Sequence, residues 1–166
     1  LEKEMHGRDF KQIAQQANDD WNENLSRITV EGGTQDQKVV FYTALYHMLI
    51  HPNILNDVNG EYPAMESNEI LKTATQRYTV FSLWDTYRNV HQMLTMVYPE
   101  RQIEMVKTML DIYKEGGWLP KWELFGRETF TMEGDPAIPV IVDTWLRGLR
   151  DFDIEYAYEA MKKGAT

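Results

Sequence analysis

The sequence has 166 residues, a formal net charge of −9 and an isoelectric point near 4.9, and 26 % of its residues are charged. This length and composition predict one soluble domain, and the acidic balance argues against nucleic acid as a partner. The sequence has no cysteine, which excludes disulfides, zinc–thiolate sites and thiol nucleophiles, and it has no apolar run long enough to span a membrane.

Two helices are predicted in the first part of the chain, each opened by a capping box. Asp9 and Thr34 are both followed three positions later by glutamine, a pattern in which two side chains satisfy backbone N–H groups at a helix start. The helix over 9–27 is amphipathic. The helix over 35–50 is apolar almost all round, so we expect it to be buried on most sides.

The middle of the chain combines a long irregular stretch with a second apolar helix. Residues 53–78 are predicted to be irregular, with a tight turn at Asn59-Gly60 that suits a hairpin. Ser82 is then expected to cap an apolar helix that continues to Val97.

Three more helices are predicted after that stretch. Pro99 opens an amphipathic helix, which ends at Gly116 and its neighbouring glycine. A loop over 118–136, rich in Trp, Pro, Gly and acidic residues, leads to an apolar helix over 138–146. The last helix, over 154–163, is amphipathic and follows a capping aspartate.

The alternation of apolar and amphipathic helices predicts an all-α fold in two concentric layers, as in an α/α toroid. The apolar helices would form an inner ring, and the amphipathic ones an outer ring that is half exposed to water. A solenoid of helical hairpins is the alternative, although no repeat of the usual length is visible. The long loops precede inner helices, which would gather them at one end of the ring. Because an incomplete ring leaves inner helices exposed, the pattern suggests that sequence is missing.

Two loop segments place a tryptophan directly beside a carboxylate. One pair is Trp84-Asp85 and the other is Trp122-Glu123. Sugar-binding sites use this pairing, because the aromatic face packs on the C–H face of a pyranose while the carboxylate accepts hydrogen bonds from hydroxyls. The alternative for each pair is a core tryptophan beside a surface or helix-capping acid.

Other polar residues are weaker candidates. Glu128 and Asp135 are among the candidate carboxylates for a general acid or base in glycoside cleavage, although Asp135 also suits a helix cap. Arg88, one helical turn after Asp85, is expected to pair with it. His47 and His51 have the i, i+4 spacing of metal ligands but no third ligand, so a structural role is favoured and no metal site is predicted.

The two loop segments and their neighbours resemble the α-mannosidases of glycoside hydrolase family 92. The most specific string is Ser-Leu-Trp-Asp-Thr-Tyr-Arg at 82–88, and it is supported by Phe-Tyr-Thr-Ala-Leu-Tyr-His at 41–47, His-Pro-Asn at 51–53, Asp-Val-Asn-Gly-Glu-Tyr at 57–62 and Leu-Pro-Lys-Trp-Glu-Leu at 119–124. The resemblance runs in order from about residue 35 to the C-terminus.

This resemblance implies a calcium-dependent, inverting, exo-acting mannosidase, α-1,2-mannosidase-like, that hydrolyses mannosides of glycans. It implies that residues 1–166 are the opening half of an (α/α)6 catalytic domain, with long loops at the active-site end. The family's β-sandwich domain and second toroid half would be partners outside this sequence. Trp84 and Asp85 match mannose-contacting positions, whereas Trp122 and Glu123 match a loop of the same rim.

The same resemblance places the catalytic acid and base, and most calcium ligands, downstream of residue 166, so no catalytic residue is assigned here. Gly126-Arg127-Glu128-Thr129 also departs from the Gly-Asn-Glu-Thr of relatives. The N-terminus carries neither an initiator methionine nor a signal pattern, and we expect a start in mid-chain; the family implies a periplasmic or secreted protein. The alternatives are a stand-alone helical carbohydrate-binding module and an interaction scaffold without sugar affinity.

Overall fold

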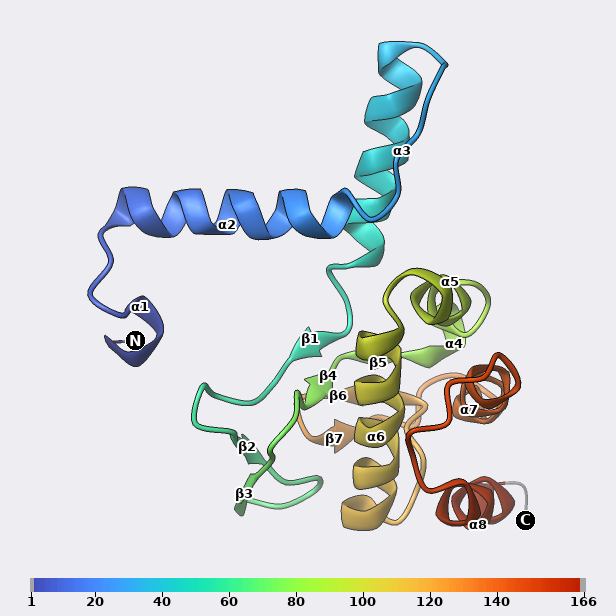
Figure 1. The fold of residues 1–166 in the computed structure, drawn as a ribbon. Coiled ribbons are helices and arrows are strands. Elements are labelled where there is room, and N and C mark those ends of the chain that lie inside the picture. Colours follow the sequence, from blue (N-terminus) through green and yellow to red (C-terminus); the bar gives the residue numbers. More distant parts are fainter. Residues whose placement is uncertain (1, 165–166) are drawn as a thin grey trace. The chain divides into compact units, whose positions relative to one another are not determined.

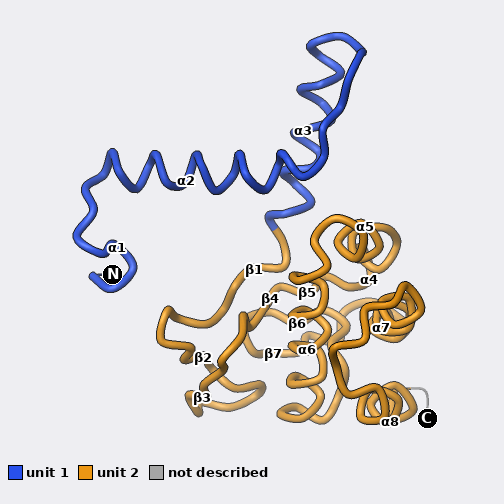
Figure 2. The backbone as a smooth tube through the Cα atoms, in the orientation of Figure 1, with its two compact units in different colours: residues 1–50 blue, residues 51–166 orange. Residues whose placement is uncertain are grey.

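The chain divides into two compact units, Leu1–Ile50 and His51–Thr166, which Figure 2 distinguishes by colour. The computed structural model describes residues 2–164.

The first unit is helical, and its two long helices start where the sequence predicts. It contains α1 (Glu2–Met5), α2 (Phe10–Leu25) and α3 (Gln35–Met48). Both predicted capping boxes are confirmed, with Asp9 opening α2 and Thr34 opening α3. The two long helices pack through Trp21 and Tyr46, whose ring centroids lie 4.5 Å apart.

The expected burial of α3 on most sides is wrong for this structure. Leu45 is its one buried residue, whereas Val40 is 69 % exposed and Val39 is also exposed. Within the unit α2 packs against one side of α3, so the apolar residues on other sides remain accessible to water.

The second unit contains seven short strands that the sequence analysis did not predict. They are β1 (Asn53–Ile54), β2 (Glu61–Pro63), β3 (Ile70–Lys72), β4 (Tyr78–Thr79), β5 (Phe81–Ser82), β6 (Trp122–Leu124) and β7 (Arg127–Glu128). They form three small antiparallel sheets, β1–β4, β2–β3 and β5–β6–β7. The purely all-α expectation is therefore corrected, because both long loops carry sheet structure.

The tight turn at Asn59-Gly60 exists, but the hairpin lies elsewhere. The Gly60 N–H donates to the Asp57 carbonyl at 2.8 Å, and Gly60 has φ of +84°. The hairpin that follows joins β2 to β3 and turns at residues 64–69. The turn is therefore confirmed, whereas the pairing of the strands was not predicted, because it depends on contacts between residues that are distant in the sequence.

Five helices complete the second unit. They are α4 (Leu83–Thr86), α5 (Val90–Val97), α6 (Pro99–Gly116), α7 (Ala137–Leu146) and α8 (Ile154–Gly164). The single helix predicted from Ser82 to Val97 is instead broken between α4 and α5, where Asn89 leaves helical geometry with φ of −155°. Ser82 does not cap the helix through its side chain, because its hydroxyl bonds to Asp85 instead.

The core of this unit forms around α6. Helices α5, α7 and α8 each pack against α6 and follow one another along it (Figure 1), while α5 also packs on α7 and α7 on α8. Strand β4 contacts α6 as well, so this amphipathic helix has a wide buried face. The fully buried apolar side chains include Phe81, Leu83, Tyr98, Val106, Met109 and Ile141.

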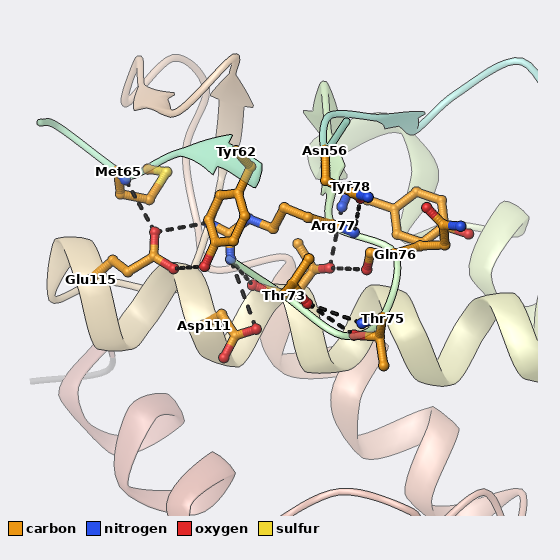
Figure 3. Close-up of polar contacts among 11 residues, drawn as sticks. Asn56, Tyr62, Met65, Thr73, Thr75, Gln76, Arg77, Tyr78, Asp111 and Glu115 are labelled. Carbon is orange, nitrogen blue, oxygen red and sulfur yellow. Dashed lines mark hydrogen bonds and ion pairs between the residues drawn. The ribbon is translucent and has the colours of Figure 1, made fainter. Parts of the chain in front are cut away.

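A buried arginine fastens the strand-bearing loop to α6 (Figure 3). The guanidinium of Arg77, only 2 % exposed, bonds Glu115 at 3.1 Å and lies over the Tyr62 ring at 4.8 Å. The Tyr62 hydroxyl donates to the other oxygen of Glu115 at 2.9 Å. Burial, together with the Glu115 carboxylate, raises the pKa of Tyr62 to about 12. Glu115 thus joins β2 and the segment before β4 to the same point of α6.

Candidate sugar-binding site

The two tryptophan–carboxylate segments are neighbours in the structure, although they are far apart in the sequence. Strand β5 pairs with β6, placing Phe81 opposite Glu123 and Ser82 opposite Trp122. The Leu83 N–H extends this contact by donating to the Lys121 carbonyl at 3.2 Å. Because the pairing leads directly into α4, it holds Trp84 and Asp85 close to the loop that carries Trp122.

The register of the strands decides which side chains share a face. Residues directly opposite each other in an antiparallel pair project to the same side. Ser82 and Trp122 therefore share one face, and the Ser82 hydroxyl donates to Asp85 Oδ2 at 3.1 Å. Phe81 and Glu123 share the other face, where both are buried. Trp122 thus lies on the same side as the Ser82–Asp85 contact.

Trp84 is a half-exposed ring with a cation on one face. It is 37 % exposed, and the Arg88 guanidinium lies 4.6 Å from its ring centroid. The same guanidinium lies 5.1 Å from the Tyr87 ring. Arg88 was expected to pair with Asp85, but no ion pair joins them among residues 2–164. Arg88 instead makes cation–π contacts with the Trp84 and Tyr87 rings.

Glu123 is buried and its carboxylate is used within the loops. It is 1 % exposed and accepts hydrogen bonds from the Thr79 hydroxyl at 2.9 Å, the Val80 N–H at 3.1 Å and the Gly126 N–H at 2.6 Å. Burial raises the pKa of Glu123, and these hydrogen bonds work in the opposite direction. The structure therefore gives Glu123 a position inside the loop; its predicted contact with sugar stays a prediction.

Glu128 is a second loop anchor, which the sequence analysis had considered only as an acid or base. Its carboxylate accepts from the N–H groups of Lys121 at 2.8 Å, Trp122 at 3.1 Å and Phe130 at 2.9 Å. Asp135 pairs with the Lys121 ammonium at 3.2 Å and makes no side-chain cap of α7. Gly126 and the acidic residues around it in the sequence indicate a tight loop. That Glu128 holds the loop backbone is visible only in the folded structure.

His47 and His51 have no further metal-ligating side chains beside them among residues 2–164. His51 Nδ1 lies 3.0 Å from the Asn53 amide oxygen. Within residues 2–164, no group of three or more His, Asp or Glu side chains is placed to hold a metal ion.

Comparison with known proteins gives the family. The pattern of the glycosyl hydrolase family 92 catalytic domain matches residues 1–166. The chain belongs to this family.

Solved structures that this family 92 chain resembles include mannosidases. An α-mannosidase of family 92 from Bacteroides thetaiotaomicron superposes with a TM-score of 0.93 at 35 % identity, over 99 % of this chain and 22 % of that one. The same enzyme has been solved in complex with mannoimidazole. An inverting family 92 mannosidase of B. thetaiotaomicron VPI-5482 gives a TM-score of 0.87 at 31 % identity, over 96 % of this chain and 22 % of that one.

One curated relative is an uncharacterized secreted glycosidase of the fungus Arthroderma benhamiae. It is 29 % identical over 169 aligned residues, which cover 99 % of this chain and 18 % of the relative. The family 92 chain thus spans about a fifth of the length of the proteins it matches. Within residues 2–164, no helix is long and apolar enough to cross a membrane.

Proposed function

We propose that this chain is part of an exo-acting, inverting α-mannosidase that hydrolyses α-1,2-linked mannosides of glycans, and that it supplies part of the mannose-binding site. The observation that carries the proposal is the β5–β6 pairing, which brings two aromatic–carboxylate segments of a family 92 chain together. The mannosidase neighbours, one of them solved in complex with mannoimidazole, support the substrate class.

Each side chain has a distinct role in this proposal. Arg88 covers one face of Trp84, and the other face packs on the C–H face of mannose. Asp85 is exposed and uses Oδ2 for Ser82, so sugar hydroxyls can donate to Oδ1. Trp122, on the same side, adds a second apolar wall. Glu123 fixes the loop behind Trp122, since a direct sugar contact would require its present hydrogen bonds to break.

The helices of the second unit support the proposal that the chain is the first half of an (α/α)6 toroid. Helices α5 and α7 would be neighbours in the inner layer, α6 and α8 neighbours in the outer layer, and both pairs are in contact. Exposed apolar residues on the inner helices, such as Val40 of α3 and Leu146 of α7, offer surfaces for the β-sandwich and the second toroid half.

In this mechanism the chain binds and orients the sugar, and the proton transfers belong to residues elsewhere. An inverting glycosidase needs a protonated carboxyl at the leaving oxygen and a carboxylate that activates water on the opposite face, with the two groups ~6.5–9.5 Å apart. Held in place by Trp84 and Asp85, mannose would meet both groups in a reactive orientation, which lowers the entropic part of the barrier.

Calcium belongs to the proposal as a cofactor of the whole protein. Within residues 2–164, no group of three or more acidic or histidine side chains is placed to hold a metal ion, so no calcium ligand is assigned to this chain. No catalytic step is therefore assigned to calcium through this chain. Secretion or a periplasmic location is part of the same proposal and is supported by the secreted relative.

Kinetics of the natural full-length protein that contains this sequence test the proposal. Trp84→Ala and Asp85→Asn should each lower kcat/KM for α-1,2-mannobiose by ~10–100-fold, because each removes a contact of ~1.5–3 kcal/mol. Trp118→Ala and Asp151→Asn are the matched controls, since Trp118 is a half-exposed ring that packs against the Lys163 ammonium of α8 and Asp151 makes a surface ion pair with Lys107.

The anomer of the released sugar provides an independent readout. Proton NMR should show β-mannose as the first product, as inversion of an α-linkage requires. Equal losses in the control variants, or α-mannose as the first product, would contradict the proposal. Mannobiose binding without hydrolysis by the full-length protein would favour the carbohydrate-binding module instead.

A further inference from the structure

A continuous line of hydrogen bonds connects α4 to the helical core. Thr86 Oγ1 lies 3.0 Å from His91 Nε2, and His91 Nδ1 lies 3.0 Å from Gln102 Oε1. Gln102 Nε2 donates to Thr144 Oγ1 at 2.9 Å. These four side chains, which we call the His91 relay, come from α4, α5, α6 and α7, and all except Thr86 are buried.

The donor and acceptor of each hydrogen bond in the relay can be assigned by starting from Thr144. The Thr144 hydroxyl donates to the Val140 carbonyl at 2.7 Å and therefore accepts from the Gln102 amide. The Gln102 oxygen is then the acceptor, so His91 carries its proton on Nδ1 and uses Nε2 to accept from the Thr86 hydroxyl. Burial lowers the pKa of His91 to about 4, which keeps the ring neutral as this arrangement requires.

Helix α4 needs such an anchor because it is too short to hold its own conformation. It contains four residues and has no side-chain N-cap, and a helix of this length has no intrinsic stability in water. Leu83 anchors its start through burial and through the hydrogen bond to Lys121. Thr86 anchors its end. Trp84 and Asp85 lie between these two anchors.

We propose that the His91 relay positions Trp84 and Asp85 for sugar, with Thr86 as the contact through which it acts. None of the four residues needs to touch substrate. They fix the orientation of α4, so the two side chains that do contact mannose are held in place before it binds. This inference rests on the proposed function for its substrate, but its structural part is testable without activity.

Thr86→Val and Thr144→Val in the natural full-length protein break the relay at its two ends with little change of shape. Thr95→Val is the matched control, because Thr95 is a buried threonine of α5 whose hydroxyl donates to the His91 carbonyl at 2.7 Å and lies outside the relay. Thr144→Val is the more informative variant, since it leaves every group near α4 unchanged.

Two measurements separate positioning from a general loss of stability. Amide hydrogen exchange of residues 84–87 should accelerate at least fivefold in both relay variants and less than twofold in Thr95→Val. KM for α-1,2-mannobiose should rise at least fivefold in the relay variants, and kcat should fall as well, because the misplaced contacts bind mannose less tightly and hold it less often in the reactive orientation.

The outcomes also distinguish this inference from the proposed function. Unchanged exchange at 84–87 overturns the relay, whether or not the protein cleaves mannosides. Faster exchange with an unchanged KM overturns its role toward sugar. Faster exchange in a protein without mannosidase activity contradicts the proposed function and the sugar role, while the anchoring of α4 stands. If Thr86→Val fails to fold, Thr144→Val decides the question by the same two readouts.

Discussion

At the residue scale, burial strongly restricts the charge of His91. Its pKa is about 4 in the folded protein because burial disfavours the imidazolium, compared with an ordinary value of 6.5. Between these values the unfolded chain binds more protons than the folded protein. The stability that neutral His91 confers is therefore complete above about pH 6.5 and is lost progressively as the pH falls toward 4, by ~3 kcal/mol in total.

Chemical denaturation between pH 7 and pH 4 measures this effect. His91→Gln has no titrating ring, so its unfolding free energy should lose less than half as much as that of the unaltered protein over this range. The comparison of slopes removes the contribution of Glu123, whose raised pKa acts in the opposite direction. Parallel pH profiles for the two proteins would show that His91 is not the group responsible.

In the candidate site, some residues can be recognised from the local sequence and others cannot. Trp84 and Trp122 stand out because a tryptophan beside a carboxylate in a loop is an unusual local combination. The burial of Glu123 has no such local signal, since it arises when Thr79 and Gly126 converge on it from different segments. The role of His91 has no local signal either. A lone histidine in an apolar helix does not indicate that Gln102 of the next helix is its hydrogen-bond partner.

At the scale of elements, Gly60 tests the turn that precedes β2. A Cβ at this position would lie 2.3 Å from the Thr73 carbonyl oxygen, and its φ of +84° is unfavourable for any side chain. Gly134 has a similar φ of +83° but has no atom within 4 Å of an added Cβ. Gly134→Ala thus carries the conformational cost alone, ~1 kcal/mol, whereas Gly60→Ala adds a steric clash with backbone.

Unfolding in urea should rank the two glycine variants. We expect Gly60→Ala to lower the free energy of unfolding by ~3 kcal/mol or more and Gly134→Ala by ~1 kcal/mol. Equal losses would mean that the Gly60 turn relaxes freely and does not hold β2 against the following segment.

The predicted elements divide according to how local their determinants are. Capping residues such as Asp9 and Thr34, and the proline and glycine that bound α6, act within one turn of the chain, and the helices they define were predicted correctly. The break between α4 and α5 was not, because an apolar helical pattern continues through it. The short strands were also missed: pairing Asn53 with Thr79 requires a fold that brings them together.

At the scale of the whole molecule, the exposed apolar residues of α3 and α7 test whether these helices are covered by other parts of the full-length protein. Val40 is 69 % and Leu146 75 % exposed, so replacing either by glutamine should change the stability of residues 1–166 alone by less than ~0.5 kcal/mol. In the natural full-length protein, the same changes should cost ~2 kcal/mol each, since there they would bury a polar amide in an apolar contact.

Tyr158→Gln is the control for this comparison, because Tyr158 is an exposed residue of α8 in the proposed outer layer. It should have little effect in either protein. Thermal unfolding of both lengths gives the result. A loss of stability in residues 1–166 alone, or none in the full-length protein, would contradict the layered arrangement and would favour a surface that remains open to water.

The pairing of β5 with β6 also sets an order of events during synthesis. Ser82 leaves the ribosome well before Trp122, and at ~5–20 residues per second several seconds pass before its partner strand is available. Helix α6 is made in that interval and can pack on α5 before the sheet closes. The nascent polypeptide therefore emerges with β5 still unpaired, and the segments that carry Trp84 and Trp122 meet only as the loop after α6 is translated.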